Sequence, residues 1–302
     1  MTSLQRALAD GAVVLDGGLG TLLESRGHDL GSSLWSARML VEHPDELRSA
    51  HREFFDAGAR VAISGSYQVS YEGFARLGHD RAATDALLAS SVQLARAARD
   101  DAAAAGADGV ERWVAASVGP YGAMLADGSE YRGDYGLGVD ELRSWHRPRL
   151  NVLGASGADV LAVETIPCLA EVEAIALELR GTGVHAWVAV TAAMGRLRSG
   201  EALEDAYAIL DGVDEIIAVG INCSDPLDVG TAIRAARSVT GKPFVAYPNS
   251  GEQWDAKNRR WMGAAAFPAD LVRDWRAAGA SLIGGCCRVG PAEIAAISAA
   301  LG

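Results

Sequence analysis

Short apolar runs recur along the chain, and each is followed by a turn signal and a longer alanine-rich segment with helical periodicity. Apolar strands that alternate with helices are typical of a parallel sheet buried on both faces. Eight such units predict an α/β fold, a closed (β/α)8 TIM barrel. An open doubly wound sheet is the alternative, but no G-x-G-x-x-G follows any of the runs. The predicted strands cover residues 12–15, 61–64, 113–118, 160–163, 186–191, 216–221, 243–247 and 281–283.

The stretches between these strands differ in their helix signals. Residues 44–56 and 268–278 are amphipathic, and each ends at a glycine, which predicts two helices. Residues 27–36 and 121–139 are insertions that a barrel does not need, and loops of that length are usually lids or binding loops. No linker rich in proline or serine divides the chain, so we expect a single domain over residues 1–302.

Composition narrows the function classes that fit the chain. Its 302 residues are 49% hydrophobic and carry 27 basic against 39 acidic side chains, a net charge of -12. That field repels nucleic acid and anionic membranes, so we expect neither as a partner. The first residues lack the apolar run of a signal peptide, and no stretch approaches the roughly 18 apolar residues of a membrane helix. A cytoplasmic, thiol-reducing location follows, in which cysteines are core residues, metal ligands or nucleophiles.

Acidic residues close two of the predicted strands, Asp16 the first and Glu164 the fourth. Catalytic groups of barrel enzymes lie at the C-terminal ends of the strands. A carboxylate there is costly unless it is paired or faces a polar cavity, which favours a functional role. The alternatives are that Glu164 caps the next helix and that Asp16 bonds amides of the glycine-rich turn after it.

Three of the four cysteines follow strands that nearly adjoin in a barrel. Cys223 ends the sixth strand, and Cys286 and Cys287 end the eighth, so their side chains are expected to converge over the barrel mouth. Successive strand residues point to opposite faces, and Gly284 and Gly285 are expected to bend the chain through their permissive φ/ψ. Adjacent cysteines also occur as small apolar core residues, which is the alternative.

Three cysteines match the ligand count of a catalytic zinc site, which keeps one position open. Three thiolates make such a site negative, which favours a nucleophilic sulfur over an acidic water. The predicted substrate is therefore a thiol, which loses its proton on coordination and attacks an electrophilic methyl group. Cys168, beside Pro167, is expected to be a small buried hydrophobe.

Several motifs resemble those of the homocysteine S-methyltransferase family, and the resemblance covers nearly the whole chain. Other stretches are similar to its small, cobalamin-independent branch, which methylates homocysteine from S-methylmethionine or S-adenosylmethionine. The family motifs are Asp16-Gly-Gly-Leu-Gly-Thr21, Glu164-Thr-Ile-Pro167, Gly220-Ile-Asn-Cys223 and Gly284-Gly-Cys-Cys287. The branch motifs are Ser33-Leu-Trp-Ser-Ala37, Ser117-Val-Gly-Pro-Tyr-Gly122, Asp127-Gly-Ser-Glu-Tyr-Arg-Gly-Asp-Tyr135 and Tyr247-Pro-Asn-Ser-Gly-Glu252.

The resemblance implies a (β/α)8 fold, Zn2+ bound by the three cysteines, and homocysteine as methyl acceptor. It implies that Glu164 binds the amino group of homocysteine and that Asp16 corresponds to the aspartate that follows the first strand in the family. The glycine loop that holds Gly18 and ends at Thr21 suits the substrate carboxylate through its amides. Asn222, from the Gly-Ile-Asn-Cys motif, is placed with the substrate-binding residues.

The methyl donor is a sulfonium, so its pocket is expected to offer aromatic faces or carboxylates. Trp35, Tyr121, Tyr131 and Asp134 lie in the two insertions, with Glu130 and Tyr135 beside them. The alternative is that these loops only cover the mouth. Asn249 is expected to orient substrate or to serve as a temporary fourth ligand, with a turn-forming asparagine as the alternative.

One segment departs from the family pattern, and two other functions compete. After Thr191 the chain continues Ala192-Ala193-Met194, where relatives commonly carry more polar residues, so a substrate contact from the fifth loop is not expected. A betaine-dependent homocysteine methyltransferase has the same barrel, and a zinc-thiolate storage or redox-sensing protein needs the same cysteines. A cobalamin-dependent methionine synthase needs further domains. The preferred donor and the oligomeric state stay open.

Overall fold

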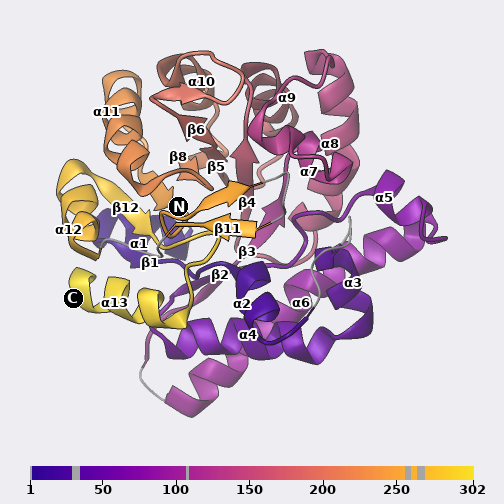
Figure 1. The fold of residues 1–302 in the computed structure, drawn as a ribbon, viewed down its shortest axis with the longest axis horizontal. Coiled ribbons are helices and arrows are strands. Elements are labelled where there is room, and N and C mark those ends of the chain that lie inside the picture. The colour runs from indigo at the N-terminus through magenta and orange to yellow at the C-terminus, as the bar shows by residue number, and fades with distance from the viewer. Residues whose placement is uncertain (1, 29–34, 107–108, 256–259, 264–268) are drawn as a thin grey trace.

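The computed structural model describes residues 2–28, 35–106, 109–255, 260–263 and 269–302 as a barrel of parallel strands surrounded by helices (Figure 1). Eight strands follow the order β1-β12-β9-β8-β5-β4-β3-β2. A bridge between Leu15 and Val61 joins the two ends, and Asp16 N donates to Val61 O over 3.0 Å. The sheet is therefore closed, which confirms the predicted (β/α)8 barrel. Its strands are β1 (Val13–Val14), β2 (Val61–Ile63), β3 (Trp113–Val118), β4 (Val160–Ile166), β5 (Ala186–Val190), β8 (Ile216–Asn222), β9 (Phe244–Tyr247) and β12 (Ala280–Ile283).

Helices follow the strands in the expected alternation. The helix predicted at 44–56 is confirmed as α4, and the one predicted at 268–278 is confirmed as α12 over its described residues, 269–278. The described helices are α1 (Ser3–Asp10), α2 (Leu19–Ser25), α3 (Trp35–Glu42), α4 (Pro44–Asp56), α5 (Tyr71–Ala75), α6 (Arg81–Gly106), α7 (Tyr121–Leu125), α8 (Val139–Gly154), α9 (Leu169–Leu179), α10 (Leu203–Asp211), α11 (Val229–Val239), α12 (Ala269–Ala278) and α13 (Pro291–Leu301), with 3-10 turns η1 (Ser129–Tyr131) and η2 (Pro226–Asp228).

The core has two parts, one inside the barrel and one between strands and helices. The inner part is filled by inward residues that include Trp113, Trp187 and Tyr247, all buried. Leu4 and Leu8 of α1 pack into the same cluster, so α1 plugs the N-terminal end of the barrel. The polar ends of the strands therefore meet at the opposite, C-terminal end.

Loops at the C-terminal end contain more structure than the sequence predicts. The insertion at 121–139 contains α7 and η1, while residues 29–34 of the first insertion lie outside the described residues. Two short antiparallel hairpins, β6–β7 (Ala192–Ala193 with Arg196–Leu197) and β10–β11 (Gln253–Asp255 with Arg260–Met262), follow β5 and β9. In the view of Figure 1 the β10–β11 hairpin is drawn across the centre of the barrel.

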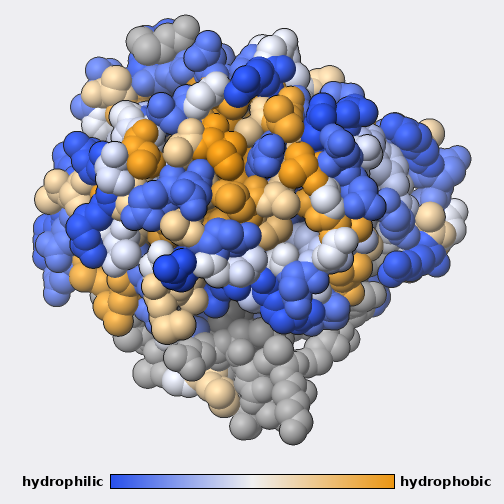
Figure 2. Space-filling model, turned by 90° about the horizontal axis from the view of Figure 1, so that it is seen from above, coloured by the Kyte–Doolittle hydropathy of each residue, from blue (hydrophilic) through white to orange (hydrophobic). Residues whose placement is uncertain are grey.

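One face of the molecule shows how hydrophilic and apolar residues are distributed on its surface. Figure 2 shows one side of the molecule, on which apolar residues gather near the middle and hydrophilic residues surround them. Among the described residues, no helix is both long and apolar enough to cross a bilayer.

Candidate active site

The three predicted cysteines meet at the barrel mouth. Cys223 follows β8, and Cys286 and Cys287 follow β12. Their sulfur atoms all lie within 4.8 Å of one another, and Cys286 Sγ lies 4.0 Å from Cys287 Sγ. Cys223 and Cys286 are placed in direct contact as a disulfide pair, with Cα atoms 5.6 Å apart. Cys168 is buried outside this group, where burial raises the pKa of its thiol to about 12.

The chemistry of this donor set fits a tetrahedral metal ion in the reduced protein, in which no bond joins Cys223 and Cys286. Zinc–sulfur bonds of about 2.3 Å at tetrahedral angles place two sulfurs about 3.8 Å apart, close to the 4.0 Å between Cys286 and Cys287. Three soft sulfur ligands with no fourth cysteine among the described residues suit an open site.

The bend that brings the two adjacent cysteines together does not arise as the sequence suggests. Gly284 and Gly285 do not have positive φ; that conformation occurs instead at Cys223 (φ 47°) and Arg288 (φ 66°). The two glycines are needed for space. A Cβ on Gly284 would lie 2.5 Å from Leu15 Cβ, and one on Gly285 would lie 2.1 Å from Val289 Cγ1. The expectation of permissive backbone angles at the glycines was therefore wrong.

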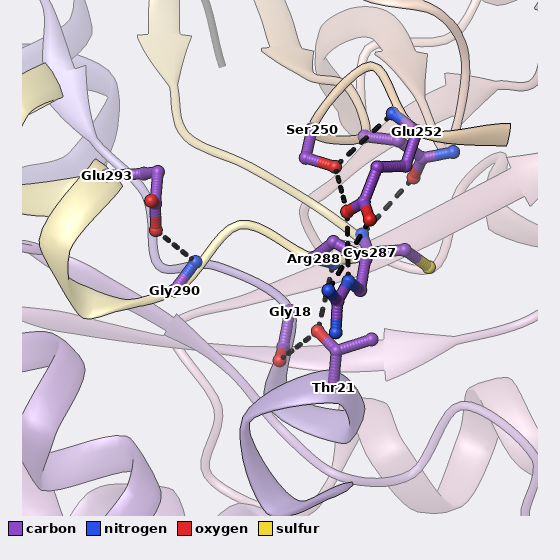
Figure 3. A network of polar contacts seen from close by, with 9 residues as sticks. Gly18, Thr21, Ser250, Glu252, Cys287, Arg288, Gly290 and Glu293 are labelled. Atoms are coloured by element: carbon purple, nitrogen blue, oxygen red, sulfur yellow. Dashed lines mark hydrogen bonds and ion pairs between the residues drawn. The ribbon is translucent and has the colours of Figure 1, made fainter. Parts of the chain in front are cut away.

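A polar network ties the cysteine loop to its neighbours (Figure 3). Thr21 Oγ1 donates to Gly18 O over 3.0 Å and accepts from Arg288 N over 2.9 Å. Arg288 in turn pairs with Glu252 at 2.9 Å, and Cys287 N donates to Asn249 Oδ1 over 3.2 Å. The side chains of Thr21 and Asn249 thus hold the loop that carries Cys287; direct contacts of Gly18, Thr21 and Asn249 with substrate stay predictions.

Glu164 lies inside the strand, not after it. The β4–β5 register shifts between Val163 and Ile166, and Thr165 has φ 62°, so Glu164 sits in a β-bulge. Bulges re-aim side chains beside active sites. The side chain of Asn222 makes two hydrogen bonds to Thr165 in this bulge. Its Oδ1 accepts from Thr165 N over 2.7 Å, and its Nδ2 donates to Thr165 Oγ1 over 2.8 Å. Asn222 therefore positions Glu164 from β8, which is separated from β4 by β5 in the sheet, and its contact with substrate stays a prediction.

Glu164 is a buried carboxyl whose pKa lies near neutral pH. Burial raises its pKa to about 7, against hydrogen bonds from Ser117 and Tyr247 that lower it. Ser117 Oγ donates to Glu164 Oε1, and Trp187 Nε1 donates to the Tyr247 hydroxyl over 3.1 Å. Sequence reasoning missed Ser117 and Tyr247 as partners, although both lie in the motifs quoted above, Ser117 one residue before the end of β3 and Tyr247 at the end of β9.

Asp16 lies within electrostatic reach of Glu164. Asp16 is 1% exposed; its Oδ2 accepts from Ile63 N over 2.7 Å, and its Oδ1 has no described hydrogen-bond partner. Burial raises the pKa of Asp16, the Ile63 amide opposes the shift, and the charge of Glu164 adds to it. An ammonium group beside these two carboxyls would compensate the cost of burying them and their mutual repulsion.

The third loop is anchored by a buried hydrogen-bonded carboxyl–imidazole pair. Tyr121 N donates to Glu171 Oε1 over 2.6 Å, and His146 Nε2 lies 2.8 Å from the same oxygen, with Glu171 and His146 both fully buried. The Tyr121 ring packs on Tyr135 and Trp145 at 5.3 and 5.2 Å between centroids. The backbone amide and the ring of Tyr121 therefore hold the third loop in place through these contacts.

The other residues predicted to bind the methyl donor differ in how near they lie to the cysteines. Tyr131 lies within electrostatic reach of Cys287 and below the guanidinium of Arg198, whose Cζ is 5.6 Å from the ring centroid. Asp134 is exposed and pairs with Arg132 at 3.3 Å, away from the cysteines' network. Trp35 begins α3, but its side chain lies outside the described residues.

Comparison with known proteins decides the family, because residues 13–301 match homocysteine S-methyltransferase. The chain belongs to the homocysteine S-methyltransferase family. The homocysteine S-methyltransferase of Escherichia coli K12 is 45% identical over 301 residues, which cover 97% of each protein. That of Bacillus subtilis, YbgG, is 44% identical over 95% of this chain and 93% of its own. The resemblance noted in the sequence motifs is thereby confirmed.

Solved structures agree with the family assignment. The metallated form of the homocysteine methyltransferase MmuM from Escherichia coli superposes with a TM-score of 0.88 at 44% identity, covering 97% of this chain and 98% of that one. Its oxidised form gives the same values. A family member of this kind thus exists in a metal-bound and an oxidised state, and the three-cysteine cluster of this chain could hold a metal.

Proposed function

We propose that this protein transfers a methyl group from a sulfonium donor, S-methylmethionine or S-adenosylmethionine, to the sulfur of L-homocysteine, with zinc held by Cys223, Cys286 and Cys287. The convergence of these three sulfurs within 4.8 Å at the mouth of a family barrel carries the proposal. Three thiolate ligands leave room for a substrate sulfur, as in catalytic zinc sites. When bound, zinc deprotonates a coordinated thiol at neutral pH.

The carboxyl groups supply the anchor for the other end of homocysteine. The unpartnered Oδ1 of Asp16 and the Glu164 carboxyl, whose pKa is about 7, both suit an ammonium group. Gly18 N is already bonded to Val289 O over 2.9 Å. The substrate carboxylate is therefore assigned to other amides of the glycine loop at the start of α2.

The chemical step needs no general base from the chain, because the thiol proton leaves before methyl transfer. A lone pair of the homocysteine thiolate forms the new bond to the methyl carbon. The bond from that carbon to the sulfonium sulfur breaks, and its electron pair stays on the donor as a neutral thioether. The products are methionine and the demethylated donor, which is a second methionine if S-methylmethionine is used. The protein's contribution is to hold the two sulfurs in line.

Donor-dependent methionine formation tests the proposal. Purified, zinc-supplied protein is incubated with homocysteine and S-methylmethionine, S-adenosylmethionine or betaine in turn. We expect methionine from a sulfonium donor and none from betaine. Methionine formed from betaine would instead support the betaine-dependent alternative.

Two cysteine variants separate catalysis from storage. Cys286→Ala should lose zinc and all methionine formation, whereas Cys168→Ala, a matched control outside the cluster, should keep both. Full zinc content and full activity in Cys286→Ala would contradict the mechanism. A wild-type protein that binds zinc but shows no thiol-dependent change in its coordination would favour a storage role.

A further inference from the structure

Arg198 reaches the mouth from the fifth loop, where no substrate contact was expected. It follows the β6–β7 hairpin, and its Nε donates to Thr191 Oγ1 over 3.3 Å. Its guanidinium carbon lies 5.6 Å from the centroid of the Tyr131 ring. Across the described ranges of the chain, no carboxylate oxygen lies within 4.0 Å of this guanidinium, although the charge of Asp228 acts on it from farther away. A half-buried guanidinium with no carboxylate partner is suited to an anionic group of a ligand.

Glu130, from the third loop, has the opposite charge and also lacks a partner. Its Oε2 is buried and accepts no hydrogen bond from any described residue. Arg132, the nearest cation along the chain, pairs instead with Asp127 and Asp134 at 3.6 and 3.3 Å. Burial raises the pKa of the Glu130 carboxyl, as expected for an acid whose charge is uncompensated. A cationic ligand group would compensate it.

Tyr131 connects these two side chains to the cysteine cluster. The pKa of its phenol is raised by burial, and further by the charges of Cys287 and Glu130, while Arg198 lowers it. The guanidinium of Arg198 therefore lies over the Tyr131 ring, and Cys287 and Glu130 lie within electrostatic reach of its hydroxyl. Tyr67, whose pKa is raised mainly by burial, lies within reach of Glu130, Tyr131 and Glu164 and adds a second aromatic side chain.

We propose that the amino-acid end of the methyl donor binds here, with its α-carboxylate on Arg198, its α-ammonium on Glu130 and its carbon chain along the Tyr131 ring. The planar fork of arginine matches a carboxylate, and an aromatic face attracts the diffuse charge of a sulfonium. The inference rests on the proposed function, since it gives a place to the second substrate of that reaction. Asp16 and Glu164 remain for homocysteine, so different loops bind the two amino acids and only the sulfur ends meet beside the cysteines.

Donor analogues that lack one charge test each contact separately. S-Methylmethionine is compared with its carboxamide, which has no carboxylate, and with 4-dimethylsulfoniobutanoate, which has no ammonium. Each analogue is measured as an alternative donor or, if turnover is slow, by its inhibition constant. The variants are Arg198→Met and Glu130→Gln. The matched controls are Arg196→Met, an exposed arginine of the same hairpin, and Glu173→Gln on the exposed side of α9.

The expected pattern is specific to the missing charge. Arg198→Met should lower kcat/KM for S-methylmethionine about tenfold or more and leave the carboxamide unchanged. Glu130→Gln should do the same for S-methylmethionine and leave 4-dimethylsulfoniobutanoate unchanged. Both variants should retain the homocysteine KM and the zinc content of the wild type, and both controls should behave as the wild type.

Four results would overturn the assignment or its premise. Equal losses with all three donors would mean that the residues only support the loop. An altered homocysteine KM with an unaltered donor KM would place them in the acceptor site instead. If the wild type uses S-methylmethionine and neither variant changes its kcat/KM, the subsite is wrong while the proposed function stands. No methionine from any sulfonium donor with the wild type would reject the proposed function itself.

Discussion

Glu164 illustrates how burial at one residue sets a pH range for binding. Its pKa of about 7 means that the carboxyl is mostly protonated at pH 6 and mostly ionised at pH 8. Because the folded value exceeds the usual one, the empty protein gains stability from the protonated form at low pH and loses it as pH rises through about 7. A bound ammonium reverses this preference, since it pairs with the ionised form.

We therefore expect ligand affinity to rise with pH between 6 and 8. Methionine, the reaction product, has the amino group but no thiol, so its binding is free of thiol ionisation. Its Kd, measured by calorimetry, should fall about tenfold over this range, as a single carboxyl of this pKa requires. Glu164→Gln should bind weakly and without this pH dependence. The same pH step in the Gln variant would assign the titration to another group.

At the scale of elements, the β4 bulge and the third loop place the site residues. The bulge holds Thr165 at φ 62°, an unfavourable conformation for a β-branched residue, and the Asn222 amide on β8 compensates it with two hydrogen bonds. The third loop depends in the same way on the buried Glu171–His146 pair. Each arrangement joins two segments of the chain and can be disrupted by one substitution.

Removing the Asn222 amide should loosen Glu164 without touching it. Asn222→Ala leaves the Thr165 amide unsatisfied, so we expect the free energy of unfolding to fall by about 2 kcal/mol and the homocysteine KM to rise. Denaturant unfolding and steady-state kinetics measure the two effects. Asn151→Ala, an exposed asparagine on α8, is the control. A destabilised variant with an unchanged homocysteine KM would show that the bulge does not position Glu164.

Removing the Glu171 carboxyl should act on the donor side only. Glu171→Ala leaves His146 and the Tyr121 amide without their acceptor, so the third loop should shift and the donor KM should rise while the homocysteine KM stays constant. Glu171→Gln keeps an acceptor oxygen and should restore part of the loss. Glu173→Ala, two residues along α9, is the control. Parallel increases in both KM values would argue against a loop-specific role.

At the scale of the whole molecule, the cysteine cluster links strands that are distant in sequence. Cys223 and Cys286 are 63 residues apart and follow β8 and β12, which flank β9 in the barrel. A metal that binds the folded state alone stabilises it by mass action. The cluster therefore couples metal content to the stability of this half of the barrel.

Chelation should lower the thermal stability of the reduced protein. Zinc at a hundredfold excess over its Kd should add about 2.7 kcal/mol to the free energy of unfolding, seen as a rise in Tm that a chelator reverses. Cys168→Ala should show the full shift and Cys286→Ala little or none. A zinc-dependent shift that survives in Cys286→Ala would place the stabilising metal elsewhere.

The fold was largely predictable because its signals are local. All eight predicted strands are found, since each is a continuous apolar run bounded by turn residues. The cysteines were predictable because strand order in a barrel brings every second strand end close. The boundary of β4 was not, because a bulge depends on a hydrogen-bond partner in another strand. For the same reason Ser117, Tyr247 and Arg198 were not recognised as neighbours of the site.

The sequence by itself determined the alternation of strands and helices, the three cysteines and two carboxylates at strand ends, and the family, since these depend on residue type and spacing along the chain. Only the tertiary structure decided which side chains share an environment. It placed strain at Cys223, Thr165 and Arg288, gave the two glycines before the cysteines a steric role, and brought Arg198 over Tyr131. Burial and hydrogen-bond partners arise between segments far apart in sequence, and the pKa of Glu164 depends on both.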